Sequence, residues 1–257
     1  MEEIKAALLG LVQGVTEFLP VSSSAHLLAL ERILGFSVKG LAFDVSLHVA
    51  TLLAVVWYFR RELSRLFRGD SFRPVMLRLL LGSIPVAALG FLLAEFREDV
   101  PSWVAVGGWT ISGIYLLTTR GLGGSTVHER LPYPRVLLVG LAQAASIFPG
   151  ISRSGSTIAA GLWLGLRRES AAEFSFFLAI PAMLGAGAHE ARHLLESPEP
   201  PGQVLGLCAV GVPIAFVVGT AAIHFLMRIV RQGAFHRFGA YNLCAAAGFA
   251  AYLLTRG

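Results

Sequence analysis

Two segments that lie 130 residues apart carry the polar side chains best suited to chemistry. The second segment echoes the first: Gly10-Leu11-Val12-Gln13 recurs as Gly140-Leu141-Ala142-Gln143, followed by a phenylalanine and two serines at the same spacing. Together the segments hold Glu17, His26 and Arg153. A carboxylate can bind a cation, an imidazole can move a proton and a guanidinium can grip a phosphate, so the pair of segments is a candidate site.

Gln13 and Glu17 are four residues apart, so they share one face of a helix that Pro20 ends. A carboxylate and a carboxamide on one face can hold a hard cation through oxygen. Glu17 is also suited to act as a general base. The alternative without chemistry is a structural ion pair between Glu17 and an arginine.

Ser22, Ser23 and Ser24 stand where a second helix is expected to begin, and His26 lies one turn into it. Serines at such a position cap the free N–H groups of the helix. The same N–H groups can bind a phosphate. His26 would then lie within reach of the anion as a base, an acid or a nucleophile, or else it is a packing residue.

The second segment centres on Arg153, whose planar fork matches two phosphate oxygens at once. Its hydroxyl-bearing neighbours are Ser152, Ser154, Ser156 and Thr157. Placing Glu17 and Arg153 at membrane depth would cost about 5–7 kcal/mol if neither charge were compensated. A mutual ion pair would offset that cost. An anionic substrate with a metal would offset it too, and would also explain the hydroxyl groups.

Four further polar residues lie in apolar surroundings, namely Asp44, His48, Thr51 and Glu173. The first three follow one helix face at i, i+4 and i+7. Solvation at a span end is the simplest expectation for Asp44, and His48 is a candidate supporting residue beside the site. For Glu173 we expect an ion pair with the arginines at 167–168.

The composition predicts an all-α polytopic membrane protein. Of 257 residues, 55% are hydrophobic and only 14% are charged, whereas soluble domains carry about 25% charged residues. The net charge of +5 comes mostly from loop arginines. In a membrane protein such charges are a topology signal, so they predict no nucleic-acid partner.

Six segments are long and apolar enough to span a membrane: about 43–59, 75–94, 103–119, 171–187, 204–227 and 239–254. Two others, about 4–34 and 135–166, each consist of two short apolar stretches around a polar break. Such stretches are too short to span, which favours re-entrant hairpins over single kinked spans. Irregular backbone at membrane depth survives only in protein or beside a wet cavity, so the two breaks are expected to share one cavity.

The order hairpin, three spans, hairpin, three spans predicts an inverted repeat within one membrane domain, with halves 1–128 and 129–257. The hairpins would then enter from opposite faces and meet near the midplane. Fourteen loop arginines fall on one side, against Lys5, Arg32, Lys39, Arg97, Arg192 and Arg256 on the other. The positive-inside rule makes the first side cytoplasmic and both termini extracytoplasmic, with 60–73 as a cytoplasmic loop.

The runs Gln13-Gly-Val-Thr-Glu17-Phe-Leu-Pro-Val-Ser-Ser-Ser-Ala-His26 and Pro149-Gly-Ile-Ser-Arg-Ser-Gly-Ser-Thr157 resemble the two signature motifs of bacterial undecaprenyl-diphosphatases, the bacitracin-resistance phosphatase family. The likeness covers essentially the whole chain. It implies hydrolysis of undecaprenyl diphosphate to undecaprenyl phosphate and phosphate, which recycles the lipid carrier of peptidoglycan synthesis. It further implies a plasma-membrane enzyme whose site opens to the extracytoplasmic side, and bacitracin as a competitor for the same lipid.

The resemblance also assigns roles. It implies a divalent cation, Mg²⁺ or Ca²⁺, held by Glu17 and Gln13, where some family members have a second glutamate in place of Gln13. The catalytic residues would be Glu17, Ser23, His26 and Arg153. For the substrate phosphates the resemblance implies Ser152, Arg153 and Thr157 as ligands. The positions of Ser22, Ser24 and Ser154 at the two helix starts add these three hydroxyls to the expected phosphate-binding residues.

Several alternatives stay open at this point. The nucleophile is either a water activated by the metal, Glu17 or His26, or a serine, with Ser23 first. A polyprenyl-phosphate flippase or an anion transporter would share the inverted repeat and the broken helices. The acid-phosphatase-like lipid phosphatases fit poorly, because they need a downstream His–Asp pair and no Asp follows Asp99. Membrane lipids are the expected surroundings, and a homo-oligomer is left open.

Overall fold

The computed structural model describes residues 2–34, 41–69, 72–93, 100–196 and 201–256, and the regular structure of this part is helical. The expected all-α class is confirmed. The elements in chain order are α1 (Glu2–Phe18), α2 (Ser23–Leu34), α3 (Leu41–Tyr58), α4 (Arg60–Arg68), α5 (Phe72–Leu92), α6 (Ser102–Leu117), the 3-10 turn η2 (His128–Arg130), α7 (Tyr133–Ala145), α8 (Arg153–Trp163), α9 (Arg168–Glu196), α10 (Pro201–Arg231) and α11 (Arg237–Arg256).

Helices occupy all six segments that were expected to span, as α3, α5, α6, α9, α10 and α11. In the described part, four stretches are long and apolar enough to cross a membrane: Phe72–Leu92, Arg168–His189, Val204–Arg231 and Arg237–Arg256. The pair α3 and α4 gives a fifth candidate, bent by 67° at its break. The protein is therefore a multi-pass membrane protein with four or five candidate spans.

One expectation is wrong: most of the 60–73 run is a helix and not a loop. Residues Arg60–Arg68 form α4, because arginine, glutamate and leucine all favour helices and because Leu63 and Leu66 share a face that packs on the core. Two of the charges that were used to orient the chain, Lys39 and Arg97, lie outside the described residues.

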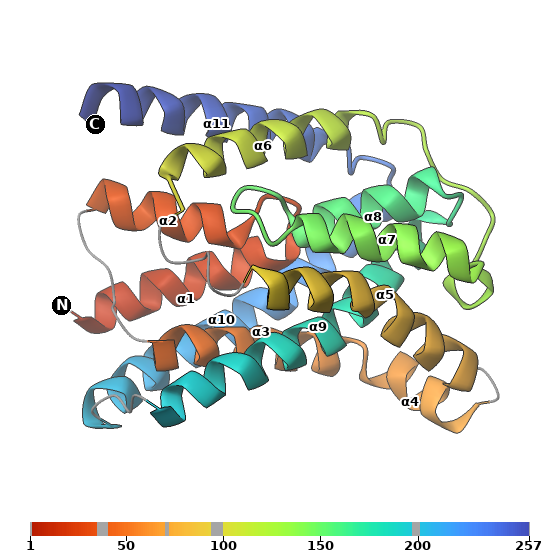
Figure 1. The fold of residues 1–257 in the computed structure, drawn as a ribbon, viewed down its shortest axis with the longest axis horizontal. Helices are drawn as coiled ribbons and strands as arrows, with labels where there is room; N and C mark the ends of the chain where they lie inside the picture. Colours follow the sequence, from red (N-terminus) through yellow and green to blue (C-terminus); the bar gives the residue numbers. More distant parts are fainter. Residues whose placement is uncertain (1, 35–40, 70–71, 94–99, 197–200, 257) are drawn as a thin grey trace.

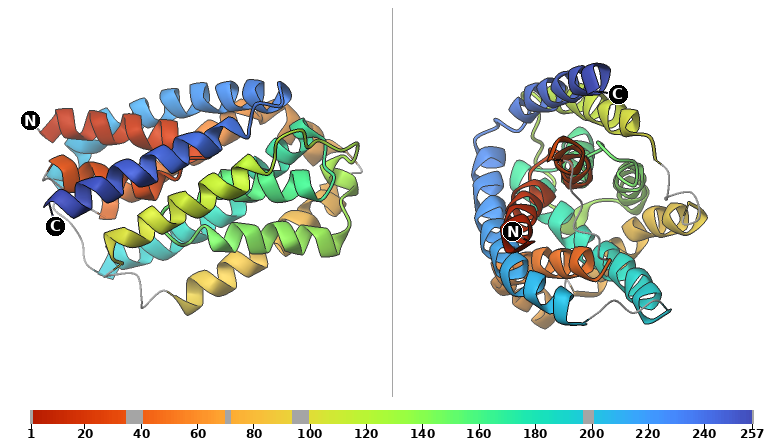
Figure 2. Two further views of the ribbon diagram at one scale, coloured as in Figure 1. Left: turned by 90° about the horizontal axis from the view of Figure 1, so that it is seen from above. Right: turned by 90° about the vertical axis from the view of Figure 1, so that its left-hand side faces the viewer.

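The helices run roughly along the long axis of the molecule (Figure 2). Both termini lie at one end and α4 lies at the other (Figure 1). Helices α1, α2, α7 and α8 occupy the middle of the view along that axis, and the other helices lie around them (Figure 2). Their two breaks meet near the middle of the molecule, so both hairpins point inward from opposite ends (Figure 1).

The first helix of each hairpin packs in the same way in both halves of the chain. Helix α1 packs against α10, and α7 packs against α5. In each pair the repeated glycine makes the closest approach: a Cβ on Gly10 would collide with the carbonyl oxygen of Gly211, and one on Gly140 with that of Gly82. The repeated glycines thus let α1 and α7 each lie directly on the backbone of a helix from the other half.

Gly108 of α6 is a position beside the second break where an added methyl group should be damaging. A Cβ there would collide with the carbonyl oxygen of Pro149 and the backbone of Gly150. We expect Gly108→Ala to destabilise the protein by about 1–3 kcal/mol, because backbone cannot move aside as a side chain can. Thermal unfolding in detergent measures this, with Gly107→Ala as the control.

The control is well matched, since Gly107 is adjacent on the same helix and no atom lies within 4 Å of its added Cβ. Gly107→Ala should unfold at or above the wild-type temperature, because alanine favours a helix over glycine. Equal unfolding temperatures for the two variants would show that the second break does not rest tightly on α6.

Candidate active site

The first break, residues 19–22, is fixed by hydrogen bonds from side chains of α6 and α11. Trp109 of α6 donates its indole N–H to the carbonyl of Val21 at 2.7 Å. Asn242 of α11 donates to the carbonyl of Pro20, also at 2.7 Å. Ser22 has a positive φ of 66°, a conformation that non-glycine residues seldom adopt. The long helices therefore satisfy the carbonyl groups that the interrupted helix leaves free.

The second break, residues 146–152, is fixed mainly by Ser112 of α6. The Ser112 hydroxyl donates to the carbonyl of Gly150 at 2.9 Å and accepts from the backbone N–H of Ser152 at 3.2 Å. Ser152 then caps α8, because its hydroxyl accepts from the backbone N–H of Gly155. Tyr115 adds a 3.3 Å hydrogen bond to the Ser152 carbonyl.

The two breaks are in direct contact, as the repeat led us to expect. The backbone N–H of Gly150 donates to the Ser22 hydroxyl at 3.1 Å. The Ser154 hydroxyl donates to the Leu19 carbonyl at 3.2 Å. The N-terminal ends of α2 and α8 are therefore brought together near the middle of the molecule.

Glu17 and Arg153 form an ion pair across this contact. An Nη atom of Arg153 lies 2.6 Å from the Glu17 Oε1 atom, and the two side chains are only 17% and 8% exposed. The other oxygen, Oε2, accepts from the Ser23 hydroxyl at 2.7 Å and from the Gln13 amide at 3.1 Å. The structure thus brings Gln13, Glu17, Ser23 and Arg153 into one partly buried cluster.

A cation could be held beside Glu17, where Gln13 and Ser23 lie. The amide oxygen of Gln13 is buried and has no hydrogen-bond partner. With the Glu17 carboxylate and the Ser23 hydroxyl it offers the oxygen donors that Mg²⁺ and Ca²⁺ prefer. No three His, Cys, Asp or Glu side chains gather to hold an ion anywhere in the described ranges.

His26 is oriented by hydrogen bonds at both of its ring nitrogens. Nδ1 lies 2.7 Å from the Ser22 carbonyl, which can only accept, so Nδ1 carries the proton. In the neutral ring Nε2 then accepts from the Tyr241 hydroxyl, also at 2.7 Å. The Tyr241 ring stacks on His26, and Trp109 packs edge-on against it. Within the described residues His26 makes no hydrogen bond to Glu17 or Arg153, so its place in the site is beside the ion pair.

The candidate phosphate-binding hydroxyls fall into two groups. Ser24 is exposed and lies 3.2 Å from the Ser22 hydroxyl. The hydroxyl groups of Ser22, Ser152 and Ser154 are buried and hold the breaks together. The Thr157 hydroxyl lies inside the protein, 2.8 Å from the Arg153 carbonyl and 2.6 Å from the Ser175 hydroxyl. In this structure Thr157 therefore positions the helix that carries Arg153.

The residues that orient the breaks from outside were missed by the motif comparison. They are Trp109, Ser112 and Tyr115 on α6 and Tyr241 and Asn242 on α11. The signal that could have found them is a polar group inside an apolar helix, since Ser112 and Asn242 are fully buried.

The other polar residues of the apolar segments have local partners. His48 Nδ1 lies 3.0 Å from the Asp44 carbonyl, and the Thr51 hydroxyl donates to the carbonyl of His48 at 2.9 Å. The expected ion pair of Glu173 with the arginines at 167–168 is wrong. Instead Glu173 Oε2 lies 3.8 Å from the Nδ1 atom of His128.

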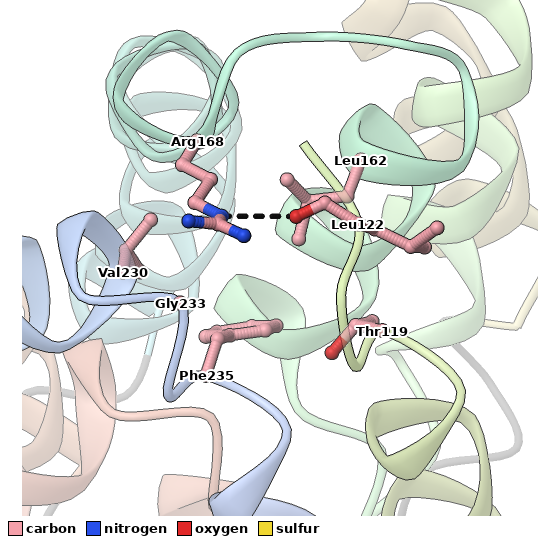
Figure 3. Close-up of a pocket in the computed structure, with 7 residues that line it drawn as sticks. All are labelled: Thr119, Leu122, Leu162, Arg168, Val230, Gly233 and Phe235. Atoms are coloured by element: carbon pink, nitrogen blue, oxygen red, sulfur yellow. Dashed lines mark hydrogen bonds between the residues drawn. The ribbon is translucent and has the colours of Figure 1, made fainter. Parts of the chain in front are cut away.

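Arg168 bonds instead to a backbone carbonyl. Its Nε–H donates to the Leu122 carbonyl at 2.9 Å, so it joins the start of α9 to the segment after α6 (Figure 3). It also lines a cavity of about 10 Å³ with Gly233 and Phe235 (Figure 3). That volume suits a single water molecule at most. The cavity contains none of the predicted site residues.

Tyr241→Phe tests whether the orientation of His26 matters for turnover. The change removes only the hydroxyl that donates to His26 Nε2. A typical hydrogen bond contributes about 0.5–1.5 kcal/mol, so we expect the rate to fall about 2- to 10-fold and its pH profile to shift. The control is Tyr252→Phe on the same helix, whose hydroxyl donates to the Arg32 carbonyl away from the breaks. Equal rates and pH profiles for the two variants would remove Tyr241 from the site.

Comparison with known proteins places the chain in a family. Residues 6–248 match the family described as bacitracin resistance protein BacA. The chain is 40% identical to the undecaprenyl-diphosphatase of Rubrobacter xylanophilus, with 99% of both chains covered. It is also 40% identical to that of Korarchaeum cryptofilum, with 97% of this chain and 98% of the relative covered. The identity to the Nitrosococcus oceani relative is 38%, over 96% and 97% of the two chains.

Proposed function

We propose, because this chain belongs to the bacitracin resistance protein BacA family, that it hydrolyses undecaprenyl diphosphate to undecaprenyl phosphate and phosphate. This activity recycles the lipid carrier of peptidoglycan synthesis and confers bacitracin resistance. We further propose that bacitracin acts as a competitor, because it binds the same lipid.

The observation that carries the proposed site is the contact of Glu17 with Arg153 and Ser23. The contact joins an acid from the first hairpin, a cation from the second and a hydroxyl at a helix start. An arginine at the N-terminal end of α8 suits a diphosphate, because its fork and the free N–H groups of the helix both favour negative charge. When substrate binds, its phosphate would replace Glu17 as the partner of Arg153.

Ser23 is the nucleophile that the geometry favours. Its hydroxyl already donates to Glu17 Oε2 at 2.7 Å, the distance expected between a nucleophile and its base. In the proposed step the Ser23 oxygen bonds to the terminal phosphorus and its proton passes to Glu17. The bond from that phosphorus to the bridging oxygen breaks, and undecaprenyl phosphate leaves with the electron pair. Water then releases phosphate from the phosphoserine and restores the hydroxyl. A phosphoserine trapped by acid quench would support this route, and normal turnover in Ser23→Ala would exclude it.

Glu17, the orphaned Gln13 oxygen and the phosphate oxygens would hold Mg²⁺ or Ca²⁺, which supplies positive charge where negative charge develops. Arg153 grips the phosphate from the other side. His26 is placed to move a proton at Nε2, through the Tyr241 hydroxyl. Ser24 is the exposed hydroxyl best placed for a further phosphate contact.

The arrangement proposed for the membrane is six spans and two re-entrant hairpins, related as an inverted repeat of residues 1–128 and 129–257. The crosswise packing of α1 on α10 and α7 on α5 supports it. The loop arginines support a cytoplasmic α4 end and termini outside the plasma membrane. The site would then open to the extracytoplasmic side, with its lipid tail among the spans.

Phosphate release by the purified protein in detergent tests the proposed function. Detergent removes the two sides that a transporter needs, so a hydrolase should still convert undecaprenyl diphosphate under these conditions. Absence of phosphate release, together with lipid or anion exchange in liposomes, would reverse the proposal in favour of a flippase or an anion transporter.

A further inference from the structure

Helix α4 carries a basic surface that the proposed hydrolysis does not use. The helix lies at the end of the molecule opposite both termini, at the edge of the bundle (Figure 1). Residues 57–73 contain five arginines against two acidic residues, Glu62 and Asp70. Clusters of basic residues next to a membrane span attract negatively charged lipids.

The exposed side chains of α4 form two rows along the helix. Arg60 and Phe67 are seven residues apart, and so are Arg61 and Arg68, so each pair lies on one line two turns apart. All four residues are exposed, and Phe67 keeps 63% of its surface accessible. The two rows together make one outward surface of three guanidinium groups and a phenyl ring, which we call the α4 basic face.

The packing of α4 directs this face away from the protein and toward the membrane surface. Leu63 and Leu66, on another side of the helix, pack on the core. Helix α4 is bent by 67° from α3, with which it forms a candidate span. The bend turns α4 away from the direction of the span and toward the plane of the membrane surface, as in an interfacial amphipathic helix.

Trp57, in the last turn of α3, indicates the depth of the α4 basic face. Its side chain is 54% exposed. The Arg60 guanidinium lies over the ring, 4.5 Å from its centroid, and donates to the Trp57 carbonyl at 2.7 Å. Tryptophan is enriched where lipid tails meet headgroups. Arg60 is therefore expected at headgroup depth, and the exposed ring of Phe67 offers a second apolar anchor.

The positive charges of the α4 basic face are not neutralised within the described part of the chain. Arg60, Arg61 and Arg68 form no ion pair with another described residue. Arg65 is set apart, because it borders a cavity that Glu129 and Glu173 also line. A free guanidinium can bind a phosphate through two parallel hydrogen bonds. Water alone gives no reason for exposed aromatic rings among the arginines, whereas an anionic membrane surface accepts both.

We propose that the α4 basic face binds the headgroups of anionic phospholipids at the membrane surface. The guanidinium groups of Arg60, Arg61 and Arg68 contact the lipid phosphates, while Trp57 and Phe67 enter the apolar layer next to them. The lipid is selected by its negative charge, so phosphatidylglycerol is preferred over zwitterionic phosphatidylcholine. Binding holds α4, and with it this end of the bundle, at the membrane surface.

Trp57 fluorescence tests the proposal, because bromine atoms on lipid chains quench a tryptophan that they contact. The purified full-length protein is placed in phosphatidylcholine vesicles with increasing fractions of dibrominated phosphatidylglycerol, and Trp57→Phe gives the signal to subtract. Each basic residue near such a surface strengthens binding about fivefold. We expect phosphatidylglycerol to be preferred over phosphatidylcholine at least about tenfold. Arg61→Gln combined with Arg68→Gln should reduce that preference at least about fivefold.

Two matched variants serve as controls. Arg61→Lys combined with Arg68→Lys keeps the charges and should keep the preference. Arg32→Gln combined with Arg256→Gln removes two exposed arginines at the opposite end of the molecule and should leave the Trp57 signal unchanged. Salt should weaken the wild-type preference, which tests the role of charge without any variant.

Equal quenching of the wild type by brominated phosphatidylglycerol and brominated phosphatidylcholine would overturn the proposal and leave an acidic protein as the remaining partner. A preference that survives in the double glutamine variant would overturn it too. The vesicles contain no substrate, so the outcome is independent of phosphate release.

Discussion

Arg153→Ala is expected to lower the rate of phosphate release from undecaprenyl diphosphate by about 100- to 1,000-fold. Removal of one preorganised donor that meets developing negative charge costs about that much in other enzymes. Arg153 is the only arginine in contact with Glu17 among the described residues, so the cluster contains no other group to replace it. The measurement is phosphate release by the purified variant at saturating substrate.

Loss of Arg153 also leaves the Glu17 carboxylate buried without its partner, which can destabilise a protein by about 3–5 kcal/mol. Arg153→Lys separates the two effects, because it keeps the charge but loses the fork that matches two phosphate oxygens. We expect this variant to unfold near the wild-type temperature and still to be slow. Arg135→Ala, on the outer face of the same hairpin, is the control for deletion of an arginine. Near-normal turnover in Arg153→Ala would remove Arg153 from the site.

Glu17→Gln is expected to have an effect of similar size, about 100-fold or more on kcat. The change keeps the size of the side chain but removes the charge that accepts the Ser23 proton. It also weakens the proposed oxygen site for a cation. Phosphate release is measured across a titration of Mg²⁺ or Ca²⁺.

The two roles of Glu17 can be separated by that titration. If Glu17 is the base for Ser23, the loss persists at saturating cation. If it acts only as a metal ligand, excess cation restores the rate, and Ser23 loses its proposed base. Glu3→Gln, at the exposed start of the same helix, should release phosphate at the wild-type rate.

Most of the fold could be predicted from the sequence, because few backbone structures are stable in a membrane. A run of apolar residues must become a helix, and a polar break within it must be enclosed by protein. Helix α4 was missed for a physical reason. Its charges suggested a solvated loop, but Leu63 and Leu66 give it an apolar stripe that packs on the core.

The residues of the site could be predicted, but their partners could only partly be predicted. The repeat indicated that Glu17 and Arg153 would meet, and they do. It did not indicate that Thr157 turns inward to Ser175, because the hydroxyls of a motif look alike in sequence. Nor could it identify Tyr241, which reaches His26 from 215 residues away, since only the packing of α11 brings them together.

The idea that neither hairpin is a site alone is tested most directly by a double-mutant cycle between the two breaks. It compares kcat/KM for phosphate release in the wild type, Glu17→Gln, Arg153→Ala and the double variant, with radiolabelled substrate for the slow proteins. Residues that act as one unit are strongly non-additive, so we expect the double variant to stay within about tenfold of the slower single variant. Losses that simply multiply would show that the two breaks act independently, and would contradict a single shared site.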